Sequence, residues 1–213
     1  MYNKAIKQYL EYLKLSGIQD IFVKPPININ KAELLQELEE KYHTCKKCAL
    51  HTGRNKFCYG NGNPNARLLI IGEGPGADED RMGEVFVGRS GQLLTKMLSA
   101  IKLSRDEVYI ANIVKCRPPA NRNPAKAEAA ACRGYLDQQI ILIQPKVILA
   151  VGAVAAHNLL QNEESVKQLR QRPHQYGNAQ TPLLVTYHPA YLLRSPAQKS
   201  KVWEDLQKLV AIL

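Results

Sequence analysis

Short apolar runs alternate with stretches of helical periodicity along most of this chain. Four runs are short enough for strands and are bounded by glycine, proline or charged residues; they cover residues 68–72, 108–114, 147–152 and 183–187. Between them, apolar side chains recur every three or four residues, as in amphipathic helices, over residues 92–103, 124–143, 153–160 and from 196 onward. Strands that alternate with helices predict a parallel sheet covered by helices on both faces.

The N-terminal region has a different pattern. Helical periodicity covers residues 2–15, Pro25-Pro26 then forbids helix, and Asn30 is placed to cap a second helix. We therefore predict two parts, a helical extension over residues 1–43 and a main domain over residues 44–213. Within the main domain, Asn123-Pro124 is a typical helix start, with a capping side chain before a proline.

Composition narrows the class of protein. The chain has 213 residues, 45% of them hydrophobic, and a formal net charge of +10, which favours a polyanionic partner such as nucleic acid. It contains no apolar run long enough to span a membrane, and charged residues near its N-terminus are unlike a signal peptide. We expect a monomeric cytoplasmic protein with no membrane partner, in which the five cysteines are not a disulfide framework.

The first strand leads into an acidic glycine loop, Gly72-Glu73-Gly74-Pro75-Gly76. The loop partly matches a dinucleotide-binding fingerprint, but Pro75 lacks the backbone N–H that a phosphate would use. Glu73 and the acidic residues at 78–80 would also repel a pyrophosphate. The glycines could let a neutral ring approach the backbone, or they could form only a tight turn with solvated carboxylates. The loop alone supports both interpretations equally.

The cysteines indicate a metal site. Cys45 and Cys48 have the spacing of a metal-binding pair, and Cys116 and Cys132 could complete a set of four thiolates. Spacing does not distinguish zinc from an iron–sulfur cluster, because both accept four thiolates. Alternatively, Cys116 and Cys132 are buried apolar residues. We interpret Cys58 as a structural thiol.

Polar residues stand at the predicted carboxyl ends of the strands, where sheets of this class bind ligands. Glu73 follows the first strand, Asn112 ends the second, and His188 follows the last. We therefore expect these three side chains near one edge of the sheet.

Taken in order, these residues resemble a known family, the iron–sulfur uracil-DNA glycosylases that form family 4 of the uracil-DNA glycosylase superfamily. The resemblance covers residues 44–213, and its motifs are Cys45-x2-Cys48, Gly60-Asn61-Gly62-Asn63-Pro64, Gly72-Glu73-Gly74-Pro75-Gly76 with Glu79-Asp80, Phe86-Val87-Gly88, Gly91-Gln92-Leu93-Leu94, Asn112-Ile113-Val114-Lys115-Cys116-Arg117-Pro118-Pro119, Cys132 and His188-Pro189-Ala190-Tyr191-Leu192. The chain departs from the family pattern at Gly74, which is usually Ala, and at Val85, which is usually Pro. It also lacks the basic, histidine-containing insertion after Gly91 found in relatives that bond covalently to the abasic site.

The resemblance implies a three-layer α/β/α sandwich around a four-stranded parallel sheet. It implies a 4Fe-4S cluster on Cys45, Cys48, Cys116 and Cys132, with a structural role beside the DNA channel. The implied reaction is hydrolysis of the bond between uracil and deoxyribose in single- or double-stranded DNA, which releases uracil and leaves an abasic site.

Residue roles follow from the resemblance and from the chemistry of a base taken out of its stack. Phe86 is the expected stacking platform, Asn112 the reader of the Watson–Crick edge, and His188 the donor that stabilises negative charge at uracil O2. The Gly74 amide can add a donor. Glu73 is expected to orient water and face the cationic sugar.

The remaining assignments concern specificity and DNA contact. Glu79 is expected to exclude a thymine methyl group, or else to be a solvated residue at a helix start. An apolar wedge is expected within Tyr191-Leu192, and phosphate contacts are expected at Arg194, Lys115 and Arg117.

Two other classes of function remain open from sequence. A non-enzymatic DNA-binding accessory module, with zinc or an iron–sulfur cluster, would suit the basic charge and the cysteines. It would not use an acidic glycine loop that faces Asn112 and His188. A nucleotide-binding redox protein is disfavoured by the charge of that loop.

Overall fold

A computed structural model describes residues 30–213. The predicted helix at 2–15 and the Pro25-Pro26 linker lie outside the described residues. Within the described part of the chain, no helix combines the length and the apolar character needed to cross a membrane.

The core of the fold is a sheet whose four central strands are parallel. Their order is β3-β2-β4-β6, and they comprise β2 (Leu68–Gly72), β3 (Tyr109–Asn112), β4 (Val147–Val151) and β6 (Thr181–Thr186). Two short antiparallel strands extend the edges: β1 (Asn61–Gly62) beside β3, and β5 (His174–Tyr176) beside β6. The predicted parallel core is confirmed, but the sheet is mixed and has six strands instead of four.

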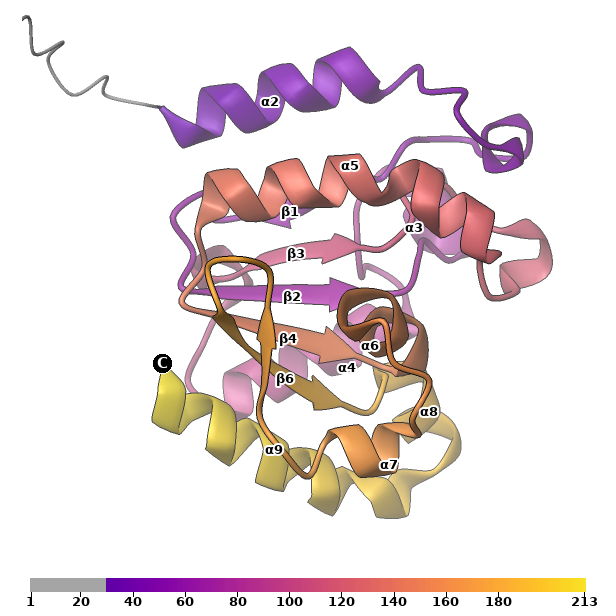
Figure 1. The fold of residues 1–213 in the computed structure, drawn as a ribbon. Helices are drawn as coiled ribbons and strands as arrows, with labels where there is room; N and C mark the ends of the chain where they lie inside the picture. The colour runs from indigo at the N-terminus through magenta and orange to yellow at the C-terminus, as the bar shows by residue number, and fades with distance from the viewer. Residues whose placement is uncertain (1–29) are drawn as a thin grey trace, which may run out of the picture. The chain divides into compact units, whose positions relative to one another are not determined.

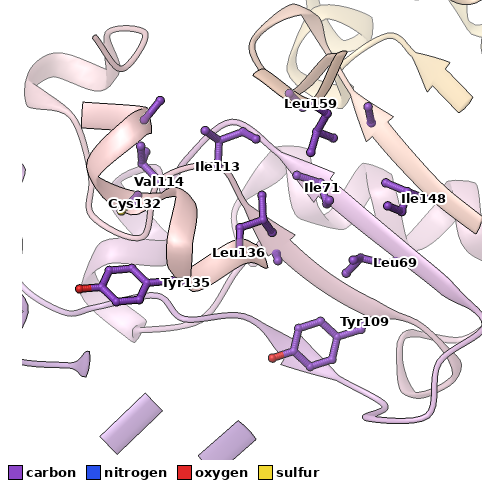
Figure 2. Close-up of a cluster of buried hydrophobic side chains, with 14 of the residues drawn as sticks. Leu69, Ile71, Tyr109, Ile113, Val114, Cys132, Tyr135, Leu136, Ile148 and Leu159 are labelled. Carbon is purple, nitrogen blue, oxygen red and sulfur yellow. The ribbon is translucent and has the colours of Figure 1, made fainter. Parts of the chain in front are cut away.

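Helices cover both faces of the sheet, so the predicted three-layer sandwich is confirmed. One face carries α5 (Lys126–Ile143), α6 (Ala153–Leu160) and α7 (Val166–Leu169), and the other carries α4 (Arg89–Ala100), α8 (Pro189–Arg194) and α9 (Lys199–Ile212). Alternate strand residues point to opposite layers, as the pleat requires. Leu69 and Ile71 pack with α5 and α6, as Figure 2 shows, whereas Leu68 and Ile70 pack with α4 and α9.

Strand register places the ends of the parallel strands at one edge. Gly72 of β2 pairs with Asn112 of β3, and Val151 of β4 pairs with Thr186 of β6. The arrowheads of these strands point toward the side of the molecule that carries α3 (Ala77–Met82), α6 and α8 (Figure 1). Residues that follow β2, β3 and β6 are therefore neighbours despite wide separation in sequence.

The helix α2 (Lys31–Tyr42) belongs to the main compact unit, which spans Lys31–Leu213. Lys31 Nζ donates to the Ile143 carbonyl at 3.0 Å, and the Tyr42 ring lies 4.5 Å from that of Tyr135 on α5. The sequence placed this helix in the extension, but its packing on α5 moves the boundary from residue 43 to residue 30.

Two predicted helix starts shift by a few residues. The helix α5 begins at Lys126 because the Ala125 N–H donates to Glu128 Oε2 at 2.7 Å, which leaves Asn123 and Pro124 outside it. The last helix begins at Lys199, after a 3-10 turn over Pro196–Gln198. Asn123 is thereby free to line the functional site described next.

Candidate active site and cysteine centre

A pocket of about 420 Å³ opens at the carboxyl ends of β2, β3 and β6. It is lined by the acidic glycine loop, by the turn that precedes α4, by the segment after β3 and by the start of α8: Glu73, Gly74, Pro75, Gly76, Glu79, Phe86, Ser90, Asn112, Pro118, Asn121, Arg122, Asn123, His188, Ala190, Tyr191 and Arg194. All six residues predicted to bind or act on the base lie in this lining.

The amide of Asn112 has an acceptor that no described residue satisfies. Asn112 is 1% exposed, and its Oδ1 is buried without a hydrogen-bond partner among the described residues. Gly72, its neighbour on β2, makes room for it, because a Cβ there would lie 2.6 Å from Oδ1. A buried acceptor without a partner is costly and rare, so this atom is suited to an N–H of a bound ligand.

Phe86 forms one wall of the pocket from an unusual backbone conformation. Its φ is 54°, in the left-handed region, and its side chain is buried. The ring lies against Gly72, where a Cβ would come within 2.6 Å of it, and its centroid is 5.7 Å from the His188 ring. The ring is therefore close to Asn112 and His188, as a stacking platform would be.

His188 is neutral and its tautomer is determined by the backbone. Burial is the main cause that lowers its pKa to about 4, and the charge of Arg194 acts in the same direction. The Ala190 N–H donates to Nδ1 at 3.1 Å, so Nδ1 is the acceptor and Nε2 carries the proton. The side chain can thus donate one hydrogen bond at neutral pH.

Glu73 is the half-buried carboxylate of the pocket. Burial raises its pKa. Its backbone carbonyl accepts from Val114 N–H at 3.1 Å, which joins the loop to the segment after β3. The side chain lines the pocket, where its carboxylate can accept hydrogen bonds, whereas His188 donates one.

The carboxylate of Glu79 binds backbone amides on two turns. Its Oε1 accepts from Val87 N–H and Gly88 N–H, both at 2.9 Å, and its Oε2 accepts from Gly76 N–H at 3.1 Å. Glu79 therefore lines the pocket while it joins the acidic loop to the Phe86 turn. It is not a solvated residue at a helix start.

Two residues predicted to contact DNA are buried instead. Lys115 is fully buried, and its Nζ donates to Gln139 Oε1 at 2.6 Å. Burial lowers its pKa to about 7, against opposing effects of the Cys132 and Cys58 thiols. Lys115 cannot reach a phosphate, and that prediction is wrong.

Leu192 cannot act as a wedge, because it is 1% exposed and packs into the core layer of α4 and α9. The exposed apolar residue of α8 is its neighbour Leu193, at 39%. Tyr191 and Arg194 line the pocket, as expected of residues near bound DNA. Arg117 is half-buried, and its Nε donates to Asn121 Oδ1 at 2.8 Å at the pocket wall.

The four predicted metal ligands lie near one another. Burial raises the pKa of Cys116, with further increases from Cys48 and Cys45; burial also raises the pKa of Cys132 to about 11, with further increases from Cys116 and Cys48. Among residues 30–213, no three His, Cys, Asp or Glu side chains converge tightly enough to hold a single ion in this geometry.

Hydrogen-bond donors point at the sulfurs of this centre. Arg54 Nη1 lies 3.2 Å from Cys116 Sγ, and Tyr135 Oη lies 3.0 Å from Cys45 Sγ. Such donors favour anionic sulfur, so the residues present fit a thiolate-bound group. Cys58 differs, because its Sγ donates to the Glu79 carbonyl at 3.2 Å and burial raises its pKa to about 12, as expected of a structural thiol.

Several functional contacts have no signature in the sequence. Arg54 binds the Cys45 and His43 carbonyls in addition to Cys116. Asp80, which is fully buried, accepts from the Asn55 backbone and side chain at 2.8 and 2.6 Å, and so ties the acidic loop to the segment next to the cysteines. These partners are mostly backbone groups, which no residue pattern reveals.

Comparison with known proteins agrees with this geometry. Residues 59–207 match the profile of the Uracil DNA glycosylase superfamily. The chain is 40% identical to the type-4 uracil-DNA glycosylase of Thermotoga maritima over 84% of this chain and 94% of that protein. It is 41% identical to the type-4 enzyme of Pyrobaculum aerophilum, over 81% and 91%, and 38% identical to that of Sulfurisphaera tokodaii, over 82% and 83%. This chain belongs to the uracil-DNA glycosylase superfamily, within its type-4 group.

Proposed function

We propose that this protein removes uracil from DNA by hydrolysing the bond between uracil N1 and deoxyribose C1′, with Asn112 as the residue that selects the base. The observation that carries the proposal is the buried Asn112 Oδ1, which has no partner among the described residues and lies beside the Phe86 ring. Free uracil offers an N–H donor of the right kind for this acceptor.

The amide distinguishes uracil from cytosine. Its Oδ1 accepts from uracil N3–H while its Nδ2 donates to O4. Cytosine presents an acceptor at N3 and a donor at the exocyclic nitrogen, so both groups of the buried amide would face the wrong partner. Sites built to hydrogen-bond a substrate reject a mismatched analogue strongly.

His188 and Glu73 divide the chemical work. When the C1′–N1 bond breaks, its electron pair stays with uracil, and Nε2–H of the neutral His188 stabilises the charge that develops at O2. The sugar becomes cationic, and the Glu73 carboxylate stabilises it and orients the water whose oxygen bonds to C1′. One proton of this water stays on the new C1′ hydroxyl, and the other leaves to solvent. Uracil takes up a proton from solvent at N1 after it departs.

DNA reaches the pocket with the base outside its stack, because the bond is inaccessible within a duplex. The net charge of +10 attracts the phosphates, and Arg194 at the pocket rim supplies a local contact. Leu193, which is exposed on the same short helix, would fill the gap left by the base in place of the buried Leu192 of the predicted Tyr191-Leu192 wedge.

The cysteine centre has a separate, structural role in the proposal. Cys45, Cys48, Cys116 and Cys132 would hold a 4Fe-4S cluster that cross-links the segment before β1, the segment after β3 and α5. No step of the reaction passes through it. Protein purified without oxygen should be brown with about four irons per chain; stoichiometric zinc without colour would contradict the assignment.

A strand-scission assay tests the activity. Oligonucleotides that differ only in carrying uracil, thymine or cytosine at one position are incubated with the protein and then heated in alkali, which cleaves at abasic sites. We expect scission with the uracil strand and none with the other two. Absence of scission with uracil, in protein that binds the same strand, would favour the accessory DNA-binding module.

A further inference from the structure

The turn that carries Phe86 is held by two charged side chains, and only one of them belongs to the pocket. On its amide side, Glu79 accepts from Val87 and Gly88 N–H. On its carbonyl side, Arg105 Nη2 donates to the Val85 carbonyl at 2.9 Å and Nη1 donates to the Phe86 carbonyl at 3.1 Å. The turn therefore depends on side chains for the hydrogen bonds that a strand or helix would supply.

The guanidinium of Arg105 suits this task by geometry. Its planar fork reaches two successive carbonyls at once, which a lysine ammonium does not reproduce. Arg105 is half-buried and lies outside the pocket lining, so it does not touch the base. Burial lowers the pKa of Arg105, whereas the nearby carboxylates of Glu84, Asp106 and Glu79 favour its charged form.

The turn needs this support because it is strained and tightly packed. Phe86 adopts a φ of 54°, which an aromatic residue rarely keeps without surrounding constraints. Its carbonyl lies against Gly91, where a Cβ would come within 1.7 Å of the oxygen. Its ring lies against Gly72 and faces His188 at 5.7 Å, so a small backbone rotation would move the ring off the base position.

Arg105 also connects the stacking ring to the base-reading amide. It begins the short 3-10 helix Arg105–Glu107, which leads directly into β3, and Asn112 ends that strand. One continuous segment thus holds the Phe86 carbonyl at one end and presents the Asn112 amide at the other. The distance between platform and reader depends on this segment.

We infer that Arg105 is a positioning residue for base recognition, which acts through the Val85 and Phe86 carbonyls to hold the Phe86 ring over the base that Asn112 reads. This inference rests on the proposed uracil-releasing function and deepens it, because it assigns part of the pocket's affinity to a residue outside the pocket.

The test compares Arg105→Met and Arg105→Lys with the wild-type full chain. Inhibition by free uracil measures pocket affinity, initial rates over a range of DNA concentrations give kcat and KM separately, and thermal unfolding measures stability. We expect free-uracil affinity and kcat/KM to fall about tenfold or more in Arg105→Met, the effect of losing charge-assisted hydrogen bonds that fix the platform. Arg105→Lys should keep the fold and lose about threefold or more.

A matched control is Arg133→Lys. Arg133 is also half-buried and also donates to a backbone carbonyl, that of Asn158 at 3.0 Å, but it lies on α5 outside the pocket. Its replacement should lower the unfolding temperature without changing free-uracil affinity. Equal uracil affinity in Arg105→Lys and Arg133→Lys would overturn the inference.

A double-mutant cycle separates positioning from general stability. In a Phe86→Ala background there is no ring to place. Adding Arg105→Met to Phe86→Ala should therefore lower kcat/KM by less than about twofold relative to Phe86→Ala alone. A merely structural residue would cause the same loss in both backgrounds, and that result would also overturn the inference.

The outcomes also distinguish the inference from the proposed function. If the wild-type protein releases no uracil, the proposed function fails. If the wild-type protein releases uracil and Arg105→Met has the same kcat/KM and free-uracil affinity, only the role of Arg105 fails.

Discussion

At the scale of single residues, burial shifts the pKa values of Glu73 and His188 in the pocket in opposite directions. It raises the pKa of Glu73 and lowers that of His188 to about 4. His188 therefore stays a neutral donor at any pH above about 4, whereas Glu73 must lose its proton before it can stabilise a cationic sugar. The two shifts assign distinct roles to neighbouring groups.

The raised pKa of Glu73 predicts an acid limb in the pH profile. A raised carboxyl pKa means that the protonated form persists to higher pH, so kcat should rise with pH through a midpoint above the ordinary glutamate pKa. In Glu73→Gln, kcat should fall about 100-fold or more relative to wild type, and the acid limb should disappear. The affinity for DNA should change little.

The control is Glu163→Gln, because Glu163 is an exposed carboxylate paired with Lys126 outside the active-site pocket. That variant should keep the wild-type limb. A Glu73→Gln variant that retains the limb, or that loses only DNA binding, would assign the carboxylate another role.

Asn112→Asp tests base selection. A carboxylate still accepts from N3–H but cannot donate to O4, so kcat/KM on uracil should fall about 100-fold or more, and cytosine should become a weak substrate. Single-turnover rates on matched uracil and cytosine strands measure both effects. Wild-type rates on uracil would reject the edge-reading role of Asn112.

Residues at strand ends were the part of the site most accessible to prediction. Glu73, Asn112 and His188 follow or end parallel strands, and parallel strands finish at one edge of a sheet. Lys115 and Leu192 were misplaced, because which residues of a loop or a short helix face inward depends on the packing around it. Burial of a lysine in particular contradicts its usual surface preference.

At the scale of elements, the buried Asp205 of α9 joins the end of α7 to the end of β6, through an ion pair with Arg170 and a hydrogen bond from Thr186. Arg170 Nε donates to Asp205 Oδ2 at 2.9 Å, and Thr186 Oγ1 donates to the same oxygen at 2.7 Å. Thr186 is the last residue of β6, two positions before His188. Asp205 therefore holds the strand end that leads to His188, and Arg170 supplies its countercharge.

Removal of one partner should be costly. Arg170→Met leaves Asp205 buried without its countercharge, in a pair whose side chains are 7% and 2% exposed, and should lower the free energy of unfolding by about 3–5 kcal/mol. Denaturant titration measures the change. The control is Arg172→Met, whose pair with Glu164 is half-exposed and should contribute about 0–1 kcal/mol. Equal losses in both variants would contradict this account.

Elements were predictable where packing demands continuous apolar sequence. The runs at 68–72 and 153–160 became β2 and α6 with the expected bounds, since both lie against the core. The edge strands β1 and β5 have two and three residues and are partly polar, so only pairing with β3 and β6 defines them. The helix α2 was expected, but its packing on α5 depends on contacts with residues more than 90 positions away.

At the scale of the whole molecule, charge predicts how DNA is engaged. With a net charge of +10, kcat/KM at low DNA concentration should fall steeply as salt increases. Arg194→Ala should lower the slope of log kcat/KM against log salt by about one, because it removes one phosphate contact. Lys146→Ala is the control, because Lys146 lies at the amino-terminal end of β4, whereas the pocket lies at the carboxyl ends of the strands. This variant should leave the slope unchanged. An unaltered slope in Arg194→Ala would place the DNA elsewhere.

The central claim concerns one cavity at the edge of the sheet, and a crystal structure of the full chain with free uracil bound tests it most directly. The account predicts a uracil ring stacked on Phe86, with N3–H donating to Asn112 Oδ1 and O2 facing His188 Nε2. Uracil bound at any other place, or bound there with its N3 edge turned away from Asn112, would contradict it.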